Sequence, residues 1–304
     1  MSNLYTHQSS NIRKTWLLMF VFLILVIVIG YAISWYTQAP EILYIAVIFA
    51  ITMNFFSYWF SDKIVIKMSR AIPVSPQDNR ELWNIVENLS ITAGLPMPKL
   101  YVINDPAPNA FATGRSPAHS AVAVTSGLLQ ILSKTELEGV IAHELSHVGN
   151  RDILVATIAV TLAGFIAVLA DISFRMTHFK GGDRDNKGGG VLMILAIVGI
   201  ILAPIAAKLI QLAVSRKREF LADASGAMLT RYPEGLASAL QKISGYAMPM
   251  KHPSHATSHL FISNPFGMPD AQRLGSGRSI GFMNKLFSSH PPVADRVNAL
   301  LGSK

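Results

Sequence analysis

Long runs of apolar residues dominate the hydrophobic pattern of this chain. Four of them are long enough for a helix that crosses a bilayer: Trp16–Tyr36, Ile42–Phe60, Ile153–Phe174 and Val191–Leu212. They follow one another in pairs, which predicts two membrane-spanning helical hairpins. A segment of mixed polar and apolar character separates the pairs. We therefore expect a mostly α-helical membrane protein with an additional folded domain.

Lysine and arginine flank the outer ends of the first hairpin. Arg13 and Lys14 precede it and Lys63, Lys67 and Arg70 follow it, whereas its short connecting loop contains neither residue type. Because basic residues accumulate on the cytoplasmic side of membrane proteins, both outer ends are expected there. The folded domain that follows the hairpin is then also cytoplasmic.

The second hairpin is less regular than the first. Asp171 and Lys208 interrupt its apolar runs, and charged residues inside a span are costly unless they are buried in protein. Its loop is also basic, which opposes an exported position. Part of this hairpin could therefore be covered by protein instead of lipid. The basic residues of the loop are Arg175, Lys180, Arg184 and Lys187.

Shorter elements lie between the hairpins. Apolar residues recur at helical spacing over Asn79–Thr92, and Leu100–Ile103 and Ala121–Thr125 have the composition of short strands. We interpret the residues between these strands, Asn104–Pro117, as a polar connection. The sequence Ser133–Glu136 is a capping box and predicts the start of a further helix. These elements indicate an α+β domain with a small sheet.

The helix that starts at this capping box contains an H-E-x-x-H motif, His143-Glu144-Leu145-Ser146-His147. Residues four positions apart share one face of a helix, so both histidines can bind one metal ion. Glu144 projects beside them and is the candidate general base for a water molecule. The chain has no cysteine, so histidine and carboxylate must supply the ligands of a zinc ion. The alternative is an ordinary half-buried helix face.

Catalytic zinc usually takes three protein ligands, so the motif requires a further one. Glu219 follows the second hairpin, as His147 precedes it, and an antiparallel hairpin would return Glu219 to the level of the motif. Asp223 lies one helical turn later and can orient a ligand imidazole. The alternative for Glu219 is a surface carboxylate paired with Arg216 or Arg218.

The composition limits the other classes of function. Hydrophobic residues make up 51% of the chain, charged residues 14%, and the mean hydropathy is +0.38, which is typical of a membrane protein. The net charge of +8 belongs to residues beside apolar runs, so no nucleic-acid partner is expected.

An intramembrane protease and a transporter that uses Asp171 and Lys208 are the alternative functions. The polar residues Asn150–Asp152 after the motif favour a site at the membrane surface.

Three more histidines lie close together in the sequence. His252, His255 and His259 belong to a segment that contains Pro and Ser but no nearby carboxylate. A zinc site normally combines such histidines with a further ligand in a defined geometry. We therefore interpret this group as part of a loop and not as a second metal site.

The motif His143–His147, followed after an apolar hairpin by Ser215–Gly226 (SRKREFLADASG), closely resembles the HtpX membrane metalloproteases, relatives of the CAAX prenyl proteases. The segments Asn109–Gly114 and Ser289–Arg296 extend the resemblance over nearly the whole chain. The resemblance implies a zincin-like domain that binds one Zn²⁺ and acts as an endopeptidase. It also implies polypeptide substrates, especially misfolded or damaged membrane proteins, during stress.

The resemblance also implies a location and further site residues. The expected place is the lipid bilayer of the bacterial cytoplasmic (inner) membrane, with several spans and the active site facing the cytosol. Asn109 and His290 are expected to contact the substrate backbone and the developing oxyanion, with Asn109–Gly114 and Ala121–Thr125 along the cleft. The expected organisation is a membrane hairpin at 1–62, a catalytic part at 63–152, a second hairpin at 153–212 and a second catalytic part at 213–304.

Overall fold

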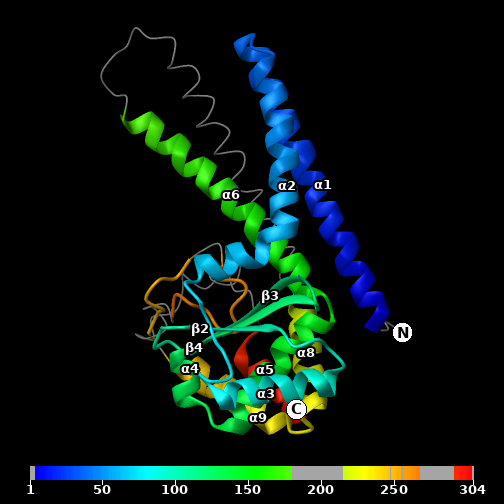
Figure 1. Cartoon of the computed structure of the whole chain (residues 1–304), viewed down its shortest axis with the longest axis vertical. Helices are drawn as coiled ribbons and strands as arrows, with labels where there is room; N and C mark the ends of the chain where they lie inside the picture. Colours follow the sequence, from blue (N-terminus) through cyan, green and yellow to red (C-terminus); the bar gives the residue numbers. More distant parts are fainter. Residues whose placement is uncertain (1–3, 180–214, 247, 255–256, 268–290, 303–304) are drawn as a thin grey trace.

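The computed structural model describes residues 4–179, 215–246, 248–254, 257–267 and 291–302. Two long helices rise from a folded domain, and a third helix leaves the same side of the domain in another direction (Figure 1). The first two are α1 (Leu4–Thr37) and α2 (Glu41–Met68), and the third is α6 (Asp152–Phe179). The amino-terminal end of α1 lies beside the domain (Figure 1).

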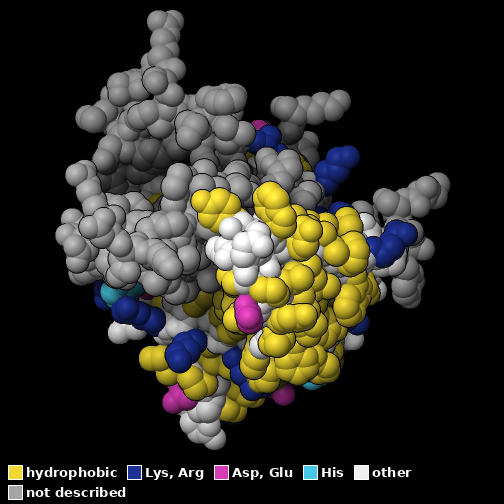
Figure 2. All heavy atoms as spheres, turned by 90° about the horizontal axis from the view of Figure 1, so that it is seen from above, with side chains coloured by type: hydrophobic (Ala, Val, Ile, Leu, Met, Phe, Trp, Pro, Cys, Tyr) yellow, Lys and Arg dark blue, Asp and Glu magenta, His cyan; other side chains and the backbone are white. Residues whose placement is uncertain are grey.

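Helices α1 and α2 confirm the first predicted hairpin. Gln8–Thr37 and Glu41–Met68 are long and apolar enough to cross a membrane. Large apolar side chains remain exposed on them, including Trp35 at 68% and Tyr44 at 67%. Figure 2, which looks down from the top of Figure 1, shows apolar side chains covering this part of the molecule. Such a surface suits contact with lipid and not with water.

Helix α6 begins where the second hairpin was predicted to begin. The preceding helix, α5 (Lys134–Gly149), meets it at 82°, and Arg151 in the bend has a positive φ of 60°. Buried side chains of α6 pack on α1, so the two helices share an apolar cluster that includes Leu18, Phe22, Leu154, Ile158 and Leu162. The predicted return run, Val191–Leu212, lies outside the described residues.

The segment between the hairpins forms a helix and a four-stranded sheet. Helix α3 (Arg80–Ala93) confirms the predicted helix: Asn79 Oδ1 accepts a hydrogen bond of 2.9 Å from Leu82 N, and Gly94 ends the helix with φ 65°. The strands are β1 (Ile72–Pro73), β2 (Lys99–Ile103), β3 (Ala110–Ser116) and β4 (His119–Thr125).

The sheet has the order β1-β2-β4-β3, in which only β2 and β4 run parallel. Strands β2 and β4 confirm the two predicted strands. The prediction of a connection over Asn104–Pro117 is wrong for its second half, where β3 forms. The residues from Ala110 to Gly114 are all buried, so β3 lacks the alternation of polar and apolar positions that reveals a half-exposed strand. Strand β3 lies at the edge of the sheet.

Helix α5 lies inside the folded domain. Its predicted capping box is present, with Ser133 N donating to Glu136 Oε2 at 2.7 Å. The elements around it include α4 (Ser126–Ile131), α8 (Arg216–Thr230), α9 (Pro233–Gly245) and α12 (Val293–Leu301). The core that covers α5 includes Val86, Val122, Val140, Ile141, Leu145, Leu236 and Val297. Residues before and after α6 therefore share one core.

Candidate metal centre

Two adjacent helices bring the three predicted ligands together. His143 and His147 lie one turn apart on α5, and Glu219 lies in the first turn of α8. The helices approach closely at Gly226, where the Cβ atom of any larger residue would lie only 2.9 Å from His143 N. A glycine at this position therefore allows α8 to pack directly against the part of α5 that contains the motif.

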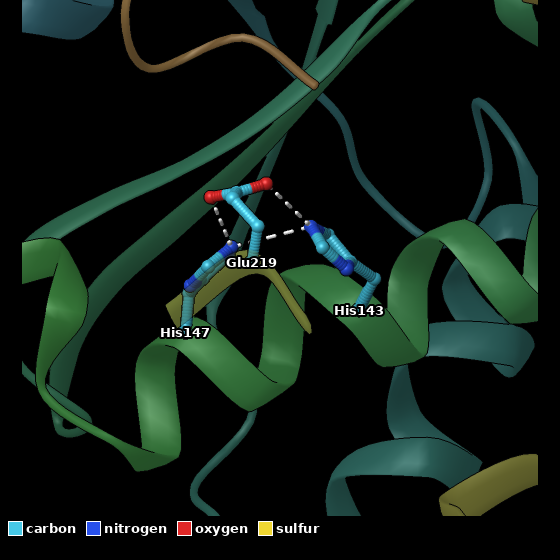
Figure 3. A group of neighbouring side chains, drawn as sticks. All are labelled: His143, His147 and Glu219. Atoms are coloured by element: carbon cyan, nitrogen blue, oxygen red, sulfur yellow. Dashed lines mark hydrogen bonds and ion pairs between the residues drawn. The ribbon is translucent and has the colours of Figure 1, made fainter. Parts of the chain in front are cut away.

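The donor atoms of these residues converge on one point (Figure 3). The two Nε2 atoms are 3.2 Å apart, and the Glu219 oxygens lie 3.8 Å from His143 Nε2 and 3.6 Å from His147 Nε2. Two donors at zinc–ligand distances of about 2.0–2.1 Å and at tetrahedral angles are separated by roughly 3.4 Å. The arrangement therefore fits the ligand set of a tetrahedral metal ion.

Each imidazole is held by a carboxylate on its other nitrogen. His143 Nδ1 lies 2.9 Å from Asp223 Oδ1, and His147 Nδ1 lies 3.0 Å from Asp152 Oδ2. A carboxylate only accepts hydrogen bonds, so each Nδ1 carries a proton and Nε2 is left as the nitrogen that can bind a metal ion. Asp223 was a candidate from the sequence, but Asp152 was not. The contact spans the 82° bend between α5 and α6, so no local sequence pattern indicates it.

The charges around His147 favour a cation at this point. Burial by itself lowers the pKa of His147. The hydrogen bond to Asp152 and the negative charges of Glu219, Asp152 and Glu144 outweigh burial and raise this pKa to about 9. The same carboxylates would attract a metal ion, which competes with the proton for Nε2.

Arg296 of α12 supports the site from the side of Asp223. Its side chain is 1% exposed, and Nε and Nη2 donate to the two Asp223 oxygens at 2.8 and 2.6 Å. Burial by itself raises the pKa of Asp223, but the hydrogen bonds and charges of Arg296 and His143 lower it to about 2. Arg296 Nη1 also lies 3.9 Å from Glu219. The sequence placed Arg296 only within a family-like segment and assigned it no role.

Glu144 lines the same pocket as the three candidate ligands. It is 2% exposed and follows His143 directly on α5. Ala112 of β3 and Ile153 of α6 contribute to the walls of this pocket, and so does the segment that contains His259. His259 was interpreted from the sequence as a loop histidine, and only the tertiary structure places it beside the candidate metal centre.

Asn109 and His290 were both predicted to contact the substrate, and both contacts stay predictions. The amide of Asn109 is 2% exposed and bonds to the backbone of Ser263: Nδ2 donates to its carbonyl at 2.9 Å, and Oδ1 accepts from its N–H at 3.1 Å. Asn109 thus holds the segment that contains Ser263 beside the start of β3. Its contact with substrate stays a prediction. His290 lies outside the described residues.

Comparisons with known proteins show the family to which this chain belongs. The model of peptidase family M48 matches residues 76–304. A protease HtpX homolog of Thermoanaerobacter pseudethanolicus is 42% identical over 304 residues, which cover 98% of this chain and 97% of the relative. A homolog of Tropheryma whipplei is 45% identical, with coverage of 98% and 97%. A homolog of Desulfatibacillum aliphaticivorans is 50% identical, with coverage of 85% and 80%.

A solved structure is also similar, although distantly. The crystal structure of S. mikatae Ste24p aligns with 97% of this chain and 67% of its own, with 18% identity and a TM-score of 0.49. This similarity is too low to add to the assignment, which rests on the family model and the HtpX relatives. The chain therefore belongs to peptidase family M48, and it is a metalloprotease similar over nearly its whole length to the HtpX proteases.

Proposed function

We propose that this chain is a membrane-bound, zinc-dependent endopeptidase in which His143, His147 and Glu219 hold the metal. The observation that supports this most directly is the convergence of two Nε2 atoms and a carboxylate within 3.2–3.8 Å. Two imidazoles and a carboxylate are a ligand set of catalytic zinc, which keeps one position open for chemistry. The two apolar helices α1 and α2 support a location in a membrane.

The residues around the metal divide the work of peptide hydrolysis. A zinc ion held by His143, His147 and Glu219 would supply the Lewis acidity that activates a water molecule and polarises the scissile carbonyl. Glu144 accepts the proton of the attacking water and transfers it to the leaving amine. Asp152 and Asp223 hold the protons on the Nδ1 atoms of the two histidines, which keeps their Nε2 atoms available as ligands.

The edge of β3 offers a binding surface for the substrate backbone. In the register with β4, the backbone N–H and C=O groups of Ala110, Ala112 and Gly114 point away from β4, toward the outer edge of the sheet. Ala110 O accepts from Ile262 N at 2.9 Å, and Gly114 N donates to Thr157 Oγ1 at 3.2 Å. Ala112 lies between these two contacts and lines the metal pocket. An extended substrate can add to the sheet there.

This mode of binding defines the class of substrate. A strand that pairs with Ala112 must be free of its own secondary structure, because its backbone N–H and C=O groups must reach the enzyme. Unfolded or damaged segments meet this condition, whereas segments in stable helices do not. Since α1 and α2 hold the catalytic domain at a membrane, misfolded membrane proteins with exposed segments are the proposed substrates in the cell.

Casein cleavage by the full-length, detergent-purified protein tests the proposed function. We expect a chelator to abolish cleavage and added Zn²⁺ to restore it, because the proposed reaction requires a metal ion bound to the three ligands. A chelator that is removed before assay, without restoring metal, provides the control for direct inhibition. Cleavage that persists in metal-free protein would contradict a zinc mechanism.

The proposal places the catalytic domain on the cytoplasmic side of the inner membrane. Lys and Arg flank the outer ends of the α1–α2 hairpin and are absent from its turn. We expect a reporter enzyme that is active only in the cytosol to be active when it is inserted near Lys134 and inactive when it is inserted near Gln38. Export of the reporter near Lys134 would reverse the proposed topology.

A further inference from the structure

Two side-chain amides of α1 contact the carboxyl-terminal end of α5. Gln8 Nε2 donates to Gly149 O at 2.7 Å, and Asn11 Nδ2 donates to Asn150 O at 3.0 Å. The last carbonyl groups of a helix have no partner within the helix, so they need donors from elsewhere. The start of the first membrane helix supplies such donors to the helix that contains the H-E-x-x-H motif.

Asn11 makes a second contact that Gln8 does not make. Its Nδ2 also donates to Asp152 Oδ1 at 2.8 Å, and the side chain is 3% exposed. The other oxygen of Asp152 lies 3.0 Å from His147 Nδ1, and Arg218 Nε lies 3.5 Å from Oδ1. The carboxylate of Asp152 is thus held between the first membrane helix and a proposed metal ligand.

We infer that Asn11 is a positioning residue for the metal site, acting on His147 through Asp152. A carboxylate can orient an imidazole only if its own rotation is restricted, and Asn11 restricts the oxygen that His147 does not use. This inference rests on the proposed role of His147 as a ligand. It makes the zinc site depend on how α1 is seated against the catalytic domain, although α1 contributes no ligand.

The alternative is that Asn11 merely attaches α1 to the domain. Gln8 provides the control for this alternative, because it lies on the same helix, has the same amide group and donates to the neighbouring carbonyl. Of these two residues, Asn11 donates to Asp152 and Gln8 does not. Loss of attachment alone should give similar effects in Gln8→Ala and Asn11→Ala, whereas a positioning role should separate them.

The zinc dissociation constant of full-length protein in detergent tests the inference. Zinc is titrated against a chromophoric chelator in wild type, Asn11→Ala and Gln8→Ala. Loss of a direct partner of a ligand typically weakens metal binding about 10-fold to 100-fold. For Asn11→Ala, one step further out, we expect a weakening of about 3-fold to 10-fold, and for Gln8→Ala less than about 2-fold. Equal effects of the two variants would overturn the inference.

A double-mutant cycle tests the route through Asp152. Asp152→Ala removes both oxygens that join Asn11 to His147, and Asn11→Ala is then expected to cause no further loss of zinc affinity. Full additivity of the two substitutions would contradict coupling through Asp152. If Asn11→Ala lowers the thermal unfolding temperature, Asn11→Asp replaces it, since it keeps the shape, removes the donors and places a like charge beside Asp152. Wild-type protein that binds no zinc would contradict the proposed function instead.

Discussion

Glu144→Gln is expected to bind zinc as tightly as the wild type and to lose casein cleavage by a factor of about 10²–10⁴, the usual contribution of a general base. Glu144 follows His143 on α5, is 2% exposed and lines the metal pocket, but it is not among the three converging donors. The substitution keeps the volume and shape of the side chain. It removes the oxygen that can accept a proton.

Zinc per chain, measured by atomic spectroscopy beside the cleavage rate, checks this expectation. Glu138→Gln is a suitable control, because Glu138 lies on the same helix before the motif and does not line the metal pocket. The control should retain both zinc and activity. A Glu144→Gln protein that loses zinc would show that Glu144 acts as a ligand, and one that keeps full activity would remove it from the mechanism.

Glu219→Gln should have a different signature, in which zinc affinity and activity fall together. Its oxygens lie 3.8 and 3.6 Å from the two Nε2 atoms, and the substitution exchanges a charged oxygen donor for a neutral one. The loss should exceed the 10-fold to 100-fold that removal of an outer partner typically causes. Arg296, 3.9 Å from Glu219, would also lose a nearby negative charge.

Cleavage measured at saturating zinc separates the loss of metal binding from the loss of catalysis. At saturating zinc, Glu219→Gln should recover part of its cleavage, because the missing affinity is compensated by concentration, whereas Glu144→Gln should recover none. The unfolding temperature of each apo protein provides the control for misfolding. A Glu219→Gln enzyme with full zinc and full activity would require a third ligand other than Glu219.

The sequence alone determined the features that depend on neighbouring residues. The apolar runs that became α1 and α2 are recognisable because a span in lipid must be apolar over its whole length. The capping box at Ser133 set the start of α5, and the periodicity of an α-helix placed His143 and His147 on one face. Asn79 and Gly94 set the limits of α3 in the same local way.

Strand β3 shows where local patterns were insufficient. Ala110, Ala112 and Gly114 are all buried. Ala110 O accepts from Ile262 N and Gly114 N donates to Thr157 Oγ1, whereas Ala112 between them lines the metal pocket. A strand whose two faces are both buried has no alternation of polar and apolar residues by which the sequence can reveal it. The family resemblance placed Asn109–Gly114 along the cleft, but only the folded chain shows that most of this segment is an edge strand.

The surroundings of the metal centre likewise depended on contacts between distant residues. Glu219 could be predicted as a ligand from its position after the apolar run. The roles of Asp152, Arg296 and Asn11 could not be predicted, because the local sequence pattern does not identify the partner of each. A buried carboxylate or guanidinium needs a partner of matching charge and geometry, and only packing decides which one it meets. The sequence thus determined the motif and its helix, whereas the tertiary structure decided which groups hold its histidines in place.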